Sequence, residues 1–412
     1  MRRNAVKKFT DLISFAVQDV ISDVYITGGL PTVSRKMGNI QFHQNIGWLH
    51  REVDSLVMEL LDDRQLRELR ERQSVDFATT VSNARLRVNI FNATRGLSLA
   101  IRVLPGHIPS IDELNLHPSL NEIPKLKSGL VLTCGPTGMG KTTTIAAIIN
   151  EINNTRTAHI VTLENPIEYR FLSNKAFIQQ RELGAHMPSF AQGLLDVLRE
   201  NPDVIVVGEL REPETMKLAL NAAESGHLVI ATLHASTPAE AIYRMCNAVQ
   251  VESQNEIRFQ VASTLNWLIV QRLVYLDRIG SRVPLLTIVR GTQSVKNIIR
   301  ENKLHQLDST LQMGRNEGMY NEDSYMNEYL SSRQKFTSPL QIFRSSKEQA
   351  EDIDYHSPVM IGGTKPAQEK KRLSIVKVEP IVINNAFGSD RDENIVTIDE
   401  GESLSELLNN IK

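Results

Sequence analysis

Cysteine is scarce in this sequence: of its 412 residues, only Cys134 and Cys246 are cysteines. Two cysteines cannot form a disulfide framework, so the sequence favours a reducing compartment such as the cytosol. Because there is no C-x-x-C pair, a zinc site built from cysteines is also excluded.

Long apolar runs are missing as well, since none reaches the ~20 residues that a membrane-spanning helix needs. Two arginines and two lysines within residues 2–8 precede FTDLISFAVQDVI, and this combination superficially resembles a signal peptide. Asp11 and Asp19 interrupt this stretch and no small-residue cleavage site follows it. The apolar residues recur at helical spacing, which predicts an amphipathic first helix.

Net charge and aromatic residues are also low, at −2 and 5%. Motors that move along nucleic acid need a basic channel or aromatic side chains on which bases stack. The composition therefore disfavours a nucleic-acid partner, and it gives no general attraction to anionic lipid.

A phosphate-binding motif is the strongest positive feature. Residues 130–150 read LVLTCGPTGMGKTTTIAAIIN, in which an apolar strand leads through a glycine-rich loop into a helix. The loop matches G-x-x-x-x-G-K-[ST] in the strand–loop–helix context that this motif requires. Its predicted nucleotide-binding residues are Gly135, Pro136, Thr137, Gly138, Met139, Gly140, Lys141, Thr142 and Thr143.

Each part of this loop has a physical role. Glycines let successive backbone N–H groups point at phosphate oxygens, and the helix N-terminus adds positive potential. Lys141 supplies a charge for the β- and γ-phosphates, and the Thr142 hydroxyl is a ligand for Mg²⁺. The sequence therefore predicts a site for ATP with Mg²⁺.

Three segments differ in pattern. Residues 1–112 predict a mixed α and β domain, with hairpin turns near Gly28 and Gly38 and one surface helix over 50–72. Residues 113–330 alternate apolar strands with helices, which is typical of an α/β domain with a mainly parallel sheet. Within it, 260–274 reads as an amphipathic helix. Residues 331–412 are polar and predict a largely disordered extension.

Acidic residues follow two of the apolar strands, where ligands bind in parallel sheets. Glu164 and Glu168 lie four apart after HIVTL, and either could activate the water that attacks the γ-phosphate. Glu209 follows PDVIVVG, which is the usual position of an acid that holds Mg²⁺ or its water. A solvated loop acid is the alternative for each.

Histidines and arginines complete the candidate set. His227 and His234 lie at the two ends of one strand, so a shared metal ion is disfavoured, and only His234 is on the ligand side. The segment around 84–103 contains Arg85, Arg87, Arg95 and Arg102. Arginine suits spread phosphate charge, and these side chains could serve a neighbouring subunit's nucleotide; a solvated strand face is the simpler alternative.

Together these motifs resemble the PilT-type ATPases of type IV pilus retraction, within the type II/IV secretion ATPase superfamily. The resemblance runs from about residue 23 to 319. It rests on GPTGMGKT (135–142), TLENPIEY (162–169), PDVIVVGELRE (202–212), GHLVIATLHA (226–235) and ARLRVNIFNATRG (84–96), in this order and spacing.

The resemblance implies a PAS-like N-terminal domain, a RecA-like ATPase domain and a homohexameric ring with ATP between subunits. It implies that Glu168 activates water, that Glu209 acts through Mg²⁺ and that the two histidines couple nucleotide state to domain position. It also implies a cytoplasmic location at the inner face of the cytoplasmic membrane, with membrane association only through a platform protein of the pilus or secretion machine.

Two details refine the resemblance. SVKNIIRE (294–301) is close to the AIRNLIRE motif of retraction ATPases but has Val-Lys in place of Ile-Arg, and the tetracysteine zinc site of extension ATPases is missing. Asn165 stands where the family has Asp. The alternatives are therefore a related secretion or conjugation ATPase, or a nucleotide-binding paralogue with weak turnover.

Overall fold

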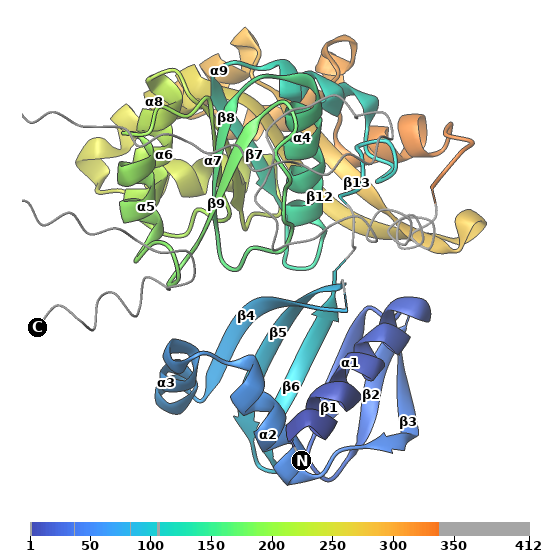
Figure 1. Cartoon of the computed structure of the whole chain (residues 1–412). Coiled ribbons are helices and arrows are strands. Elements are labelled where there is room, and N and C mark those ends of the chain that lie inside the picture. Colours follow the sequence, from blue (N-terminus) through green and yellow to red (C-terminus); the bar gives the residue numbers. More distant parts are fainter. Residues whose placement is uncertain (1, 37, 83, 105–107, 338–412) are drawn as a thin grey trace, which may run out of the picture. The chain divides into compact units, whose positions relative to one another are not determined.

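Two β-sheets with their own helices form the part of the chain that the structure describes. The structure is a computed structural model, and it describes residues 2–36, 38–82, 84–104 and 108–337 (Figure 1). One sheet is antiparallel and the other is mixed, so the fold is of the α/β class with helices packed on both sheets.

The first sheet has six strands in the order β3-β2-β1-β6-β5-β4, and neighbouring strands are antiparallel. Its strands are β1 (Asp23–Thr27), β2 (Pro31–Lys36), β3 (Asn39–Gly47), β4 (Ser74–Val81), β5 (Ala84–Ala93) and β6 (Gly96–Val103). The helices α1 (Arg2–Gln18) and α2 (His50–Leu60) pack on it (Figure 1). Phe9 and Ile13 of α1 join Leu56 and strand residues in one core.

The prediction of a single helix over 50–72 was wrong, because the structure has two. After α2, a second helix, α3 (Asp63–Arg72), begins. Asp62 caps it: its carboxylate accepts a hydrogen bond from the Gln65 backbone N–H at 2.7 Å. An aspartate that caps a helix start has extended backbone, and this ends the preceding helix.

The second sheet has seven strands in the order β13-β12-β7-β11-β10-β8-β9. They are β7 (Gly129–Cys134), β8 (His159–Glu164), β9 (Phe177–Glu182), β10 (Val204–Val207), β11 (Leu228–Leu233), β12 (Leu265–Leu276) and β13 (Ser281–Arg290). All neighbours are parallel except the β12–β13 hairpin. A central parallel sheet is the arrangement that the apolar runs predicted.

Helices cover both faces of this sheet (Figure 1). Alternate residues of β7 contribute to two cores, with Leu130 and Leu132 in one and Val131 in the other. The first core includes α5 (Phe190–Val197), α6 (Pro213–Glu224), α7 (Pro238–Asn247), α8 (Gln254–Thr264), α9 (Gln293–Arg300) and α10 (Leu307–Met313). The second includes α4 (Lys141–Thr155) with η1 (Pro118–Lys125) and η6 (Tyr325–Leu330). Shorter helical turns are η2 (Val251–Ser253), η3 (Asp277–Ile279), η4 (Leu304–Gln306), η5 (Gly314–Glu317) and α11 (Glu322–Ser324).

The helix predicted over 260–274 was also wrong. Helix α8 ends at Thr264, and residues 265–276 form β12, which pairs with β7 on one side and β13 on the other. Such a strand is buried on both faces and is therefore nearly all apolar, so its pattern does not differ from that of a buried helix. Strand β9 is a further element that the apolar runs did not predict.

The last described residues pack back onto the second sheet's domain. The Phe336 ring contacts two guanidinium groups, those of Arg278 and Arg333. The Asn115 side chain forms two hydrogen bonds with the backbone of Thr337, each 2.8 Å long. Residues 338–412 lie outside the described part, so the predicted disorder of the extension stays a prediction there, as does the domain boundary at residue 112.

A membrane-spanning helix is not found in the described part of the chain, because no helix there combines the needed length and apolar character.

Candidate nucleotide-binding site

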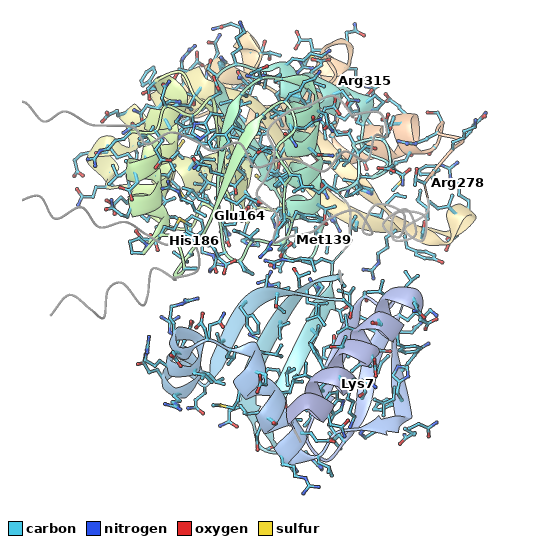
Figure 2. The ribbon with its side chains drawn as sticks, in the orientation of Figure 1. Lys7, Met139, Glu164, His186, Arg278 and Arg315 are labelled. Carbon is cyan, nitrogen blue, oxygen red and sulfur yellow. The ribbon has the colours of Figure 1, made fainter. Side chains whose placement is uncertain are left out.

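A cavity of about 940 Å³ lies at the carboxyl ends of the parallel strands. The glycine-rich loop follows β7, Glu164 ends β8, Glu209 follows β10 and His234 follows β11. Met139 of the loop and Glu164 lie at the same end of the sheet's strands (Figure 2). The strand ends therefore gather the candidate groups at one place, as parallel topology requires.

Most predicted site residues line this cavity, but some do not. Those that line it are Thr137, Gly138, Gly140, Lys141, Thr142, Thr143, Glu164, Glu168, Glu209, His234, Arg87 and Arg102. Those that do not are Gly135, Pro136, Met139, Arg85, Arg95 and His227.

The glycine-rich loop leaves β7 through an unusual backbone. Gly135 has a φ of +138°, and a Cβ atom there would lie 2.3 Å from the backbone oxygen of Gln271. Gly140 also has a positive φ, +81°, immediately before α4 begins. Only glycine fits the first position, because the loop passes directly against β12.

Lys141 is almost fully buried at the start of α4. Its ammonium group donates to the carbonyl oxygens of Gly135 at 2.6 Å and Pro136 at 2.9 Å. Burial lowers the pKa of Lys141, and the nearby Glu209 opposes this effect. The loop carbonyls thus hold the charge inside the loop, where phosphate oxygens would replace them as partners.

Glu164, at the end of β8, is a desolvated candidate acid. Its Oε1 accepts hydrogen bonds from the Thr162 hydroxyl at 2.6 Å and the Gln180 amide at 3.1 Å. Burial raises the pKa of Glu164 to about 7, with smaller contributions from Glu168 and Glu182. A carboxyl with this pKa changes its charge near neutral pH.

Glu168 has a different environment because an arginine neutralises it. Arg87 of β5 donates to Glu168 Oε1 at 2.8 Å and pairs with Asp76 Oδ2 at 2.7 Å. The pKa of Arg87 is raised, since its two carboxylate partners outweigh its burial. Glu168 is therefore paired with a group that belongs to the first sheet.

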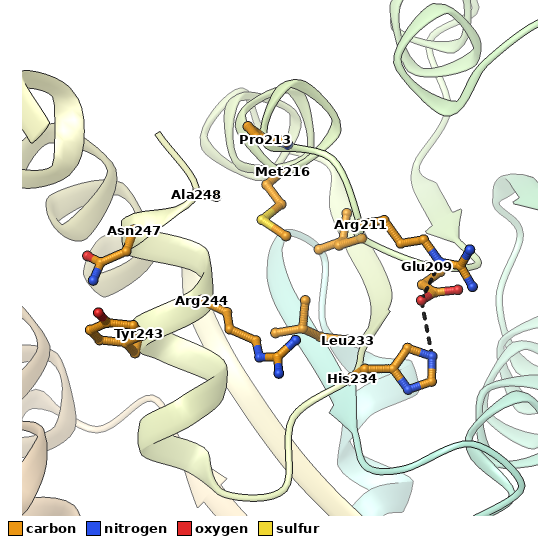
Figure 3. Close-up of a pocket in the computed structure, with 11 residues that line it drawn as sticks. Glu209, Arg211, Pro213, Met216, Leu233, His234, Tyr243, Arg244, Asn247 and Ala248 are labelled. Atoms are coloured by element: carbon orange, nitrogen blue, oxygen red, sulfur yellow. Dashed lines mark ion pairs between the residues drawn. The ribbon is translucent and has the colours of Figure 1, made fainter. Parts of the chain in front are cut away.

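Glu209 also has neighbours that carry nitrogen atoms. Its Oε1 lies 2.7 Å from Arg211 Nε and 3.1 Å from His234 Nε2. Arg211 is mostly exposed, and its pKa is raised chiefly by its hydrogen bond to Glu209. Figure 3 shows this group beside a smaller pocket of about 480 Å³ toward α6 and α7.

The remaining arginines and His227 are more dispersed. Arg85 donates to the Ile167 carbonyl oxygen at 2.8 Å, beside Glu168, and Arg102 pairs with Asp23 at 3.0 Å. Arg95 lies exposed in the turn between β5 and β6. His227 precedes β11 at its amino end and is hydrogen-bonded to the Pro202 carbonyl at 2.8 Å, so it lies at the other end of that strand from His234.

Sequence reasoning missed several residues of the cavity. Asn115 and Thr337 line it together, although they are far apart in the sequence. Gln271 lines it from β12, and Tyr169 forms a 3.0 Å hydrogen bond with Thr143. Tyr169 ends the quoted segment 162–169 but was not singled out, and the other three lie in no quoted motif. Only a correct prediction of β12 could have placed Gln271 next to the loop.

Comparison with known proteins gives the family. The family described as "Type II/IV secretion system protein" matches residues 7–331. The chain belongs to this family. It is 40% identical to the "Uncharacterized protein YggR" of Escherichia coli (strain K12), over 75% of this chain and 94% of that one. It is 37% identical to the "Type IV pilus retractation ATPase PilT" of Pseudomonas aeruginosa PAO1, over 76% and 91%.

A solved structure has the same fold. The crystal structure of the "Pilus Retraction Motor PilT and Bound ADP" matches with a TM-score of 0.71 at 35% identity, covering 82% of this chain and 96% of that chain. The PilT resemblance inferred from the motifs is therefore confirmed. Residues after 331 lie beyond the family match.

Proposed function

We propose that this chain is a motor ATPase that couples ATP hydrolysis to retraction of a type IV pilus, and thereby to twitching motility. The observation that carries this proposal is the convergence of the loop lysine with three acids in one cavity, in a chain that aligns with 91% of a retraction ATPase. The two sheets would correspond to a PAS-like domain and a RecA-like P-loop domain.

The proposed assembly is a homohexameric ring at the cytoplasmic face of the inner membrane. It would bind an inner-membrane platform protein of the pilus machine and no nucleic acid. In such a ring a head-to-tail contact closes on itself, so exposed arginines such as Arg95 can serve a neighbour's nucleotide. The relative named as a type IV pilus retraction ATPase supports the proposal.

In the proposed site, the loop N–H groups and Lys141 bind the phosphates of ATP. Lys141 would exchange the Gly135 and Pro136 carbonyls for phosphate oxygens. Arg87 and Arg102, which line the same cavity, would add charge for the phosphates. Proximity of these cations stabilises the charge that spreads over the transferred phosphoryl group.

The residues present also fit Mg²⁺. Thr142 and Glu209 supply oxygen ligands in the same cavity, and the described residues contain no group of three His, Cys, Asp or Glu side chains that could hold a metal ion alone. A site of few protein ligands suits Mg²⁺, which keeps water and phosphate oxygens around it. When bound, this ion neutralises phosphate charge.

Glu168 is the proposed base for the attacking water. Its carboxylate is paired with Arg87 in the cavity, whereas burial raises the pKa of Glu164 to about 7. Glu168 would take the proton of the water while Arg87 turns toward the phosphates. Glu164 would then position the Glu168 segment, and His234 would keep Glu209 in place.

A second reading is a nucleotide-binding paralogue with weak turnover. Asn165 favours it, because it lines the cavity where the family has an acid. A related secretion or conjugation ATPase has the same chemistry and differs only in the machine that it drives.

The test combines chemistry with biology. We expect purified protein to hydrolyse ATP, and Lys141→Ala to reduce this about a thousandfold, because the charge that holds the phosphates is lost. Deletion of the gene should leave excess surface pili without twitching motility. Loss of pili together with motility would indicate an assembly motor, and intact pili and motility would overturn the pilus assignment.

A further inference from the structure

Gln271 lies at the point where the phosphate-binding loop leaves the sheet. Strand β12 runs parallel to β7 as far as Val270, which is opposite Cys134, the last residue of β7. Gln271 is the next residue along β12, and it is 1% exposed. Its backbone oxygen is the atom that forbids a side chain at position 135. A fully buried polar side chain here needs partners, because an unpaired amide in this position is costly.

Both polar atoms of the Gln271 side chain are used by the loop and its helix. The amide nitrogen donates to the Met139 carbonyl oxygen at 2.7 Å, and the amide oxygen accepts from the Thr144 hydroxyl at 2.7 Å. A backbone carbonyl only accepts hydrogen bonds, so the NH₂ group must face Met139. The oxygen is then left for Thr144, which is itself buried.

This contact fixes the direction of one peptide group. In a planar trans peptide the carbonyl oxygen and the following N–H point in opposite directions. Since the Met139 oxygen is held toward β12, the N–H of Gly140 points away from β12. That orientation offers a donor to an anion, whereas a flipped peptide would offer an oxygen.

Glycine makes such a lock necessary. Gly140 has a positive φ, and glycine populates both positive and negative φ with similar ease. The peptide between residues 139 and 140 therefore has little intrinsic preference for either orientation. An outside contact must select the anion-binding one before the ligand arrives, which lowers the cost of binding.

We propose that Gln271 is a positioning residue of the nucleotide site, which locks the 139–140 peptide in its phosphate-binding orientation and is itself oriented by Thr144. The ligand class is a nucleoside di- or triphosphate. The proposal rests on the proposed function, and it assigns a role in binding to a residue outside the loop motif.

The experiment measures ADP binding by fluorescence titration and ATP hydrolysis for the full-length chain. Gln271→Met keeps the length and loses both hydrogen bonds. It should weaken ADP binding about tenfold and raise KM for ATP by a similar factor, because a buried hydrogen bond is lost. The change in kcat should be smaller, since the lost contact holds the phosphates in both the ground and the transition state.

Thr144 supplies the internal check. Thr144→Val should weaken ADP binding less than Gln271→Met does, and Thr144→Ser should bind like the wild type because it keeps the hydroxyl. The double variant Gln271→Met/Thr144→Val should bind no more weakly than Gln271→Met alone, because Thr144 acts only through Gln271.

A matched control separates positioning from stability. Leu268→Ala removes a buried side chain of the same strand that packs in the core of the other face. It should lower Tm and leave the KM of the folded protein unchanged. If Gln271→Met lowers Tm but leaves KM and ADP affinity at wild-type values, the positioning role is wrong. If the wild type itself binds no ADP, the proposed function fails, and this inference with it.

Discussion

The two sides of the cavity are held by different kinds of contact. On the loop side, the contacts are formed by neutral, buried groups: Gln271, Thr144 and the backbone of residues 135–140. On the acid side, Glu168 and Glu209 are each paired with an arginine, and these arginines are exposed to a third or more. Buried neutral hydrogen bonds respond little to salt, whereas partly exposed ion pairs are screened by it.

This difference indicates a division of roles. The loop side is built before ligand arrives and needs no change of charge partners apart from Lys141. The acid side is neutralised within the protein, so its arginines must change partners when phosphates bind. Substitutions on the acid side should therefore change turnover or KM while the preformed loop remains intact.

The largest effect is expected at Glu168. Glu168→Gln keeps the size of the side chain but cannot accept a proton, so kcat for ATP hydrolysis should fall by about two to four orders of magnitude. ADP binding should remain within about threefold of the wild type, because the loop side is intact. Steady-state kinetics and ADP titration check this. Near-normal turnover would move the base to Glu164.

Arg87 should have the next largest effect. Arg87→Lys keeps a charge but loses the fork that contacts Asp76 and Glu168, so KM for ATP should rise about tenfold. Arg35→Ala, on β2 of the same sheet, is the control and should leave KM unchanged. A faster enzyme after Arg87→Lys would show that this ion pair inhibits Glu168 and does not serve the phosphates.

Asn165 should have a moderate effect. Asn165→Asp restores the acid usual in the family at a position that lines the cavity. We expect kcat to rise, within about tenfold and below the effect of removing Glu168. Comparing kcat for the two proteins at saturating ATP and Mg²⁺ is sufficient. An unchanged kcat would remove the main support for a weak-turnover paralogue.

The smallest effect concerns stability and pH. The pKa of Glu164 is raised from 4.5 to about 7, so the folded chain holds this proton to higher pH than the unfolded chain. The contribution is fully favourable below pH 4.5 and is lost as pH rises to about 7. Glu164→Gln should flatten this part of the pH dependence of unfolding.

The measurement is denaturant unfolding at several pH values across that interval. Glu71→Gln, which changes an exposed glutamate of α3, is the control and should keep the wild-type slope. An identical slope in Glu164→Gln would show that other groups produce the pH dependence.

The sequence predicted those parts of the site that depend on local pattern. The loop motif needs only residues 130–150, and the acids Glu164 and Glu209 follow apolar runs that form parallel strands. Parallel topology then brings these strand ends together without further information. The same reasoning placed His227 and His234 at opposite ends of β11, as the structure shows.

The parts that the sequence did not predict depend on contacts between distant segments. Residues 265–270 are apolar except for Asn266, a pattern that suits a buried helix or a buried strand, and only pairing with β7 decides between them. The partner of Glu168 is an arginine 81 residues earlier in the chain. No spacing rule specifies such a pair, and the Gln271–Met139 contact is of the same kind.

The contact between Asn115 and Thr337 has a practical consequence for anyone preparing this protein. The family match ends at residue 331, which invites truncation there. A chain cut at that point would lose both Arg333 and Phe336, so Arg278 would lose its contact with the Phe336 ring, and the Asn115 amide would lose its backbone partner in the cavity wall. Expression boundaries should therefore follow Thr337, so that kinetic constants describe a complete cavity.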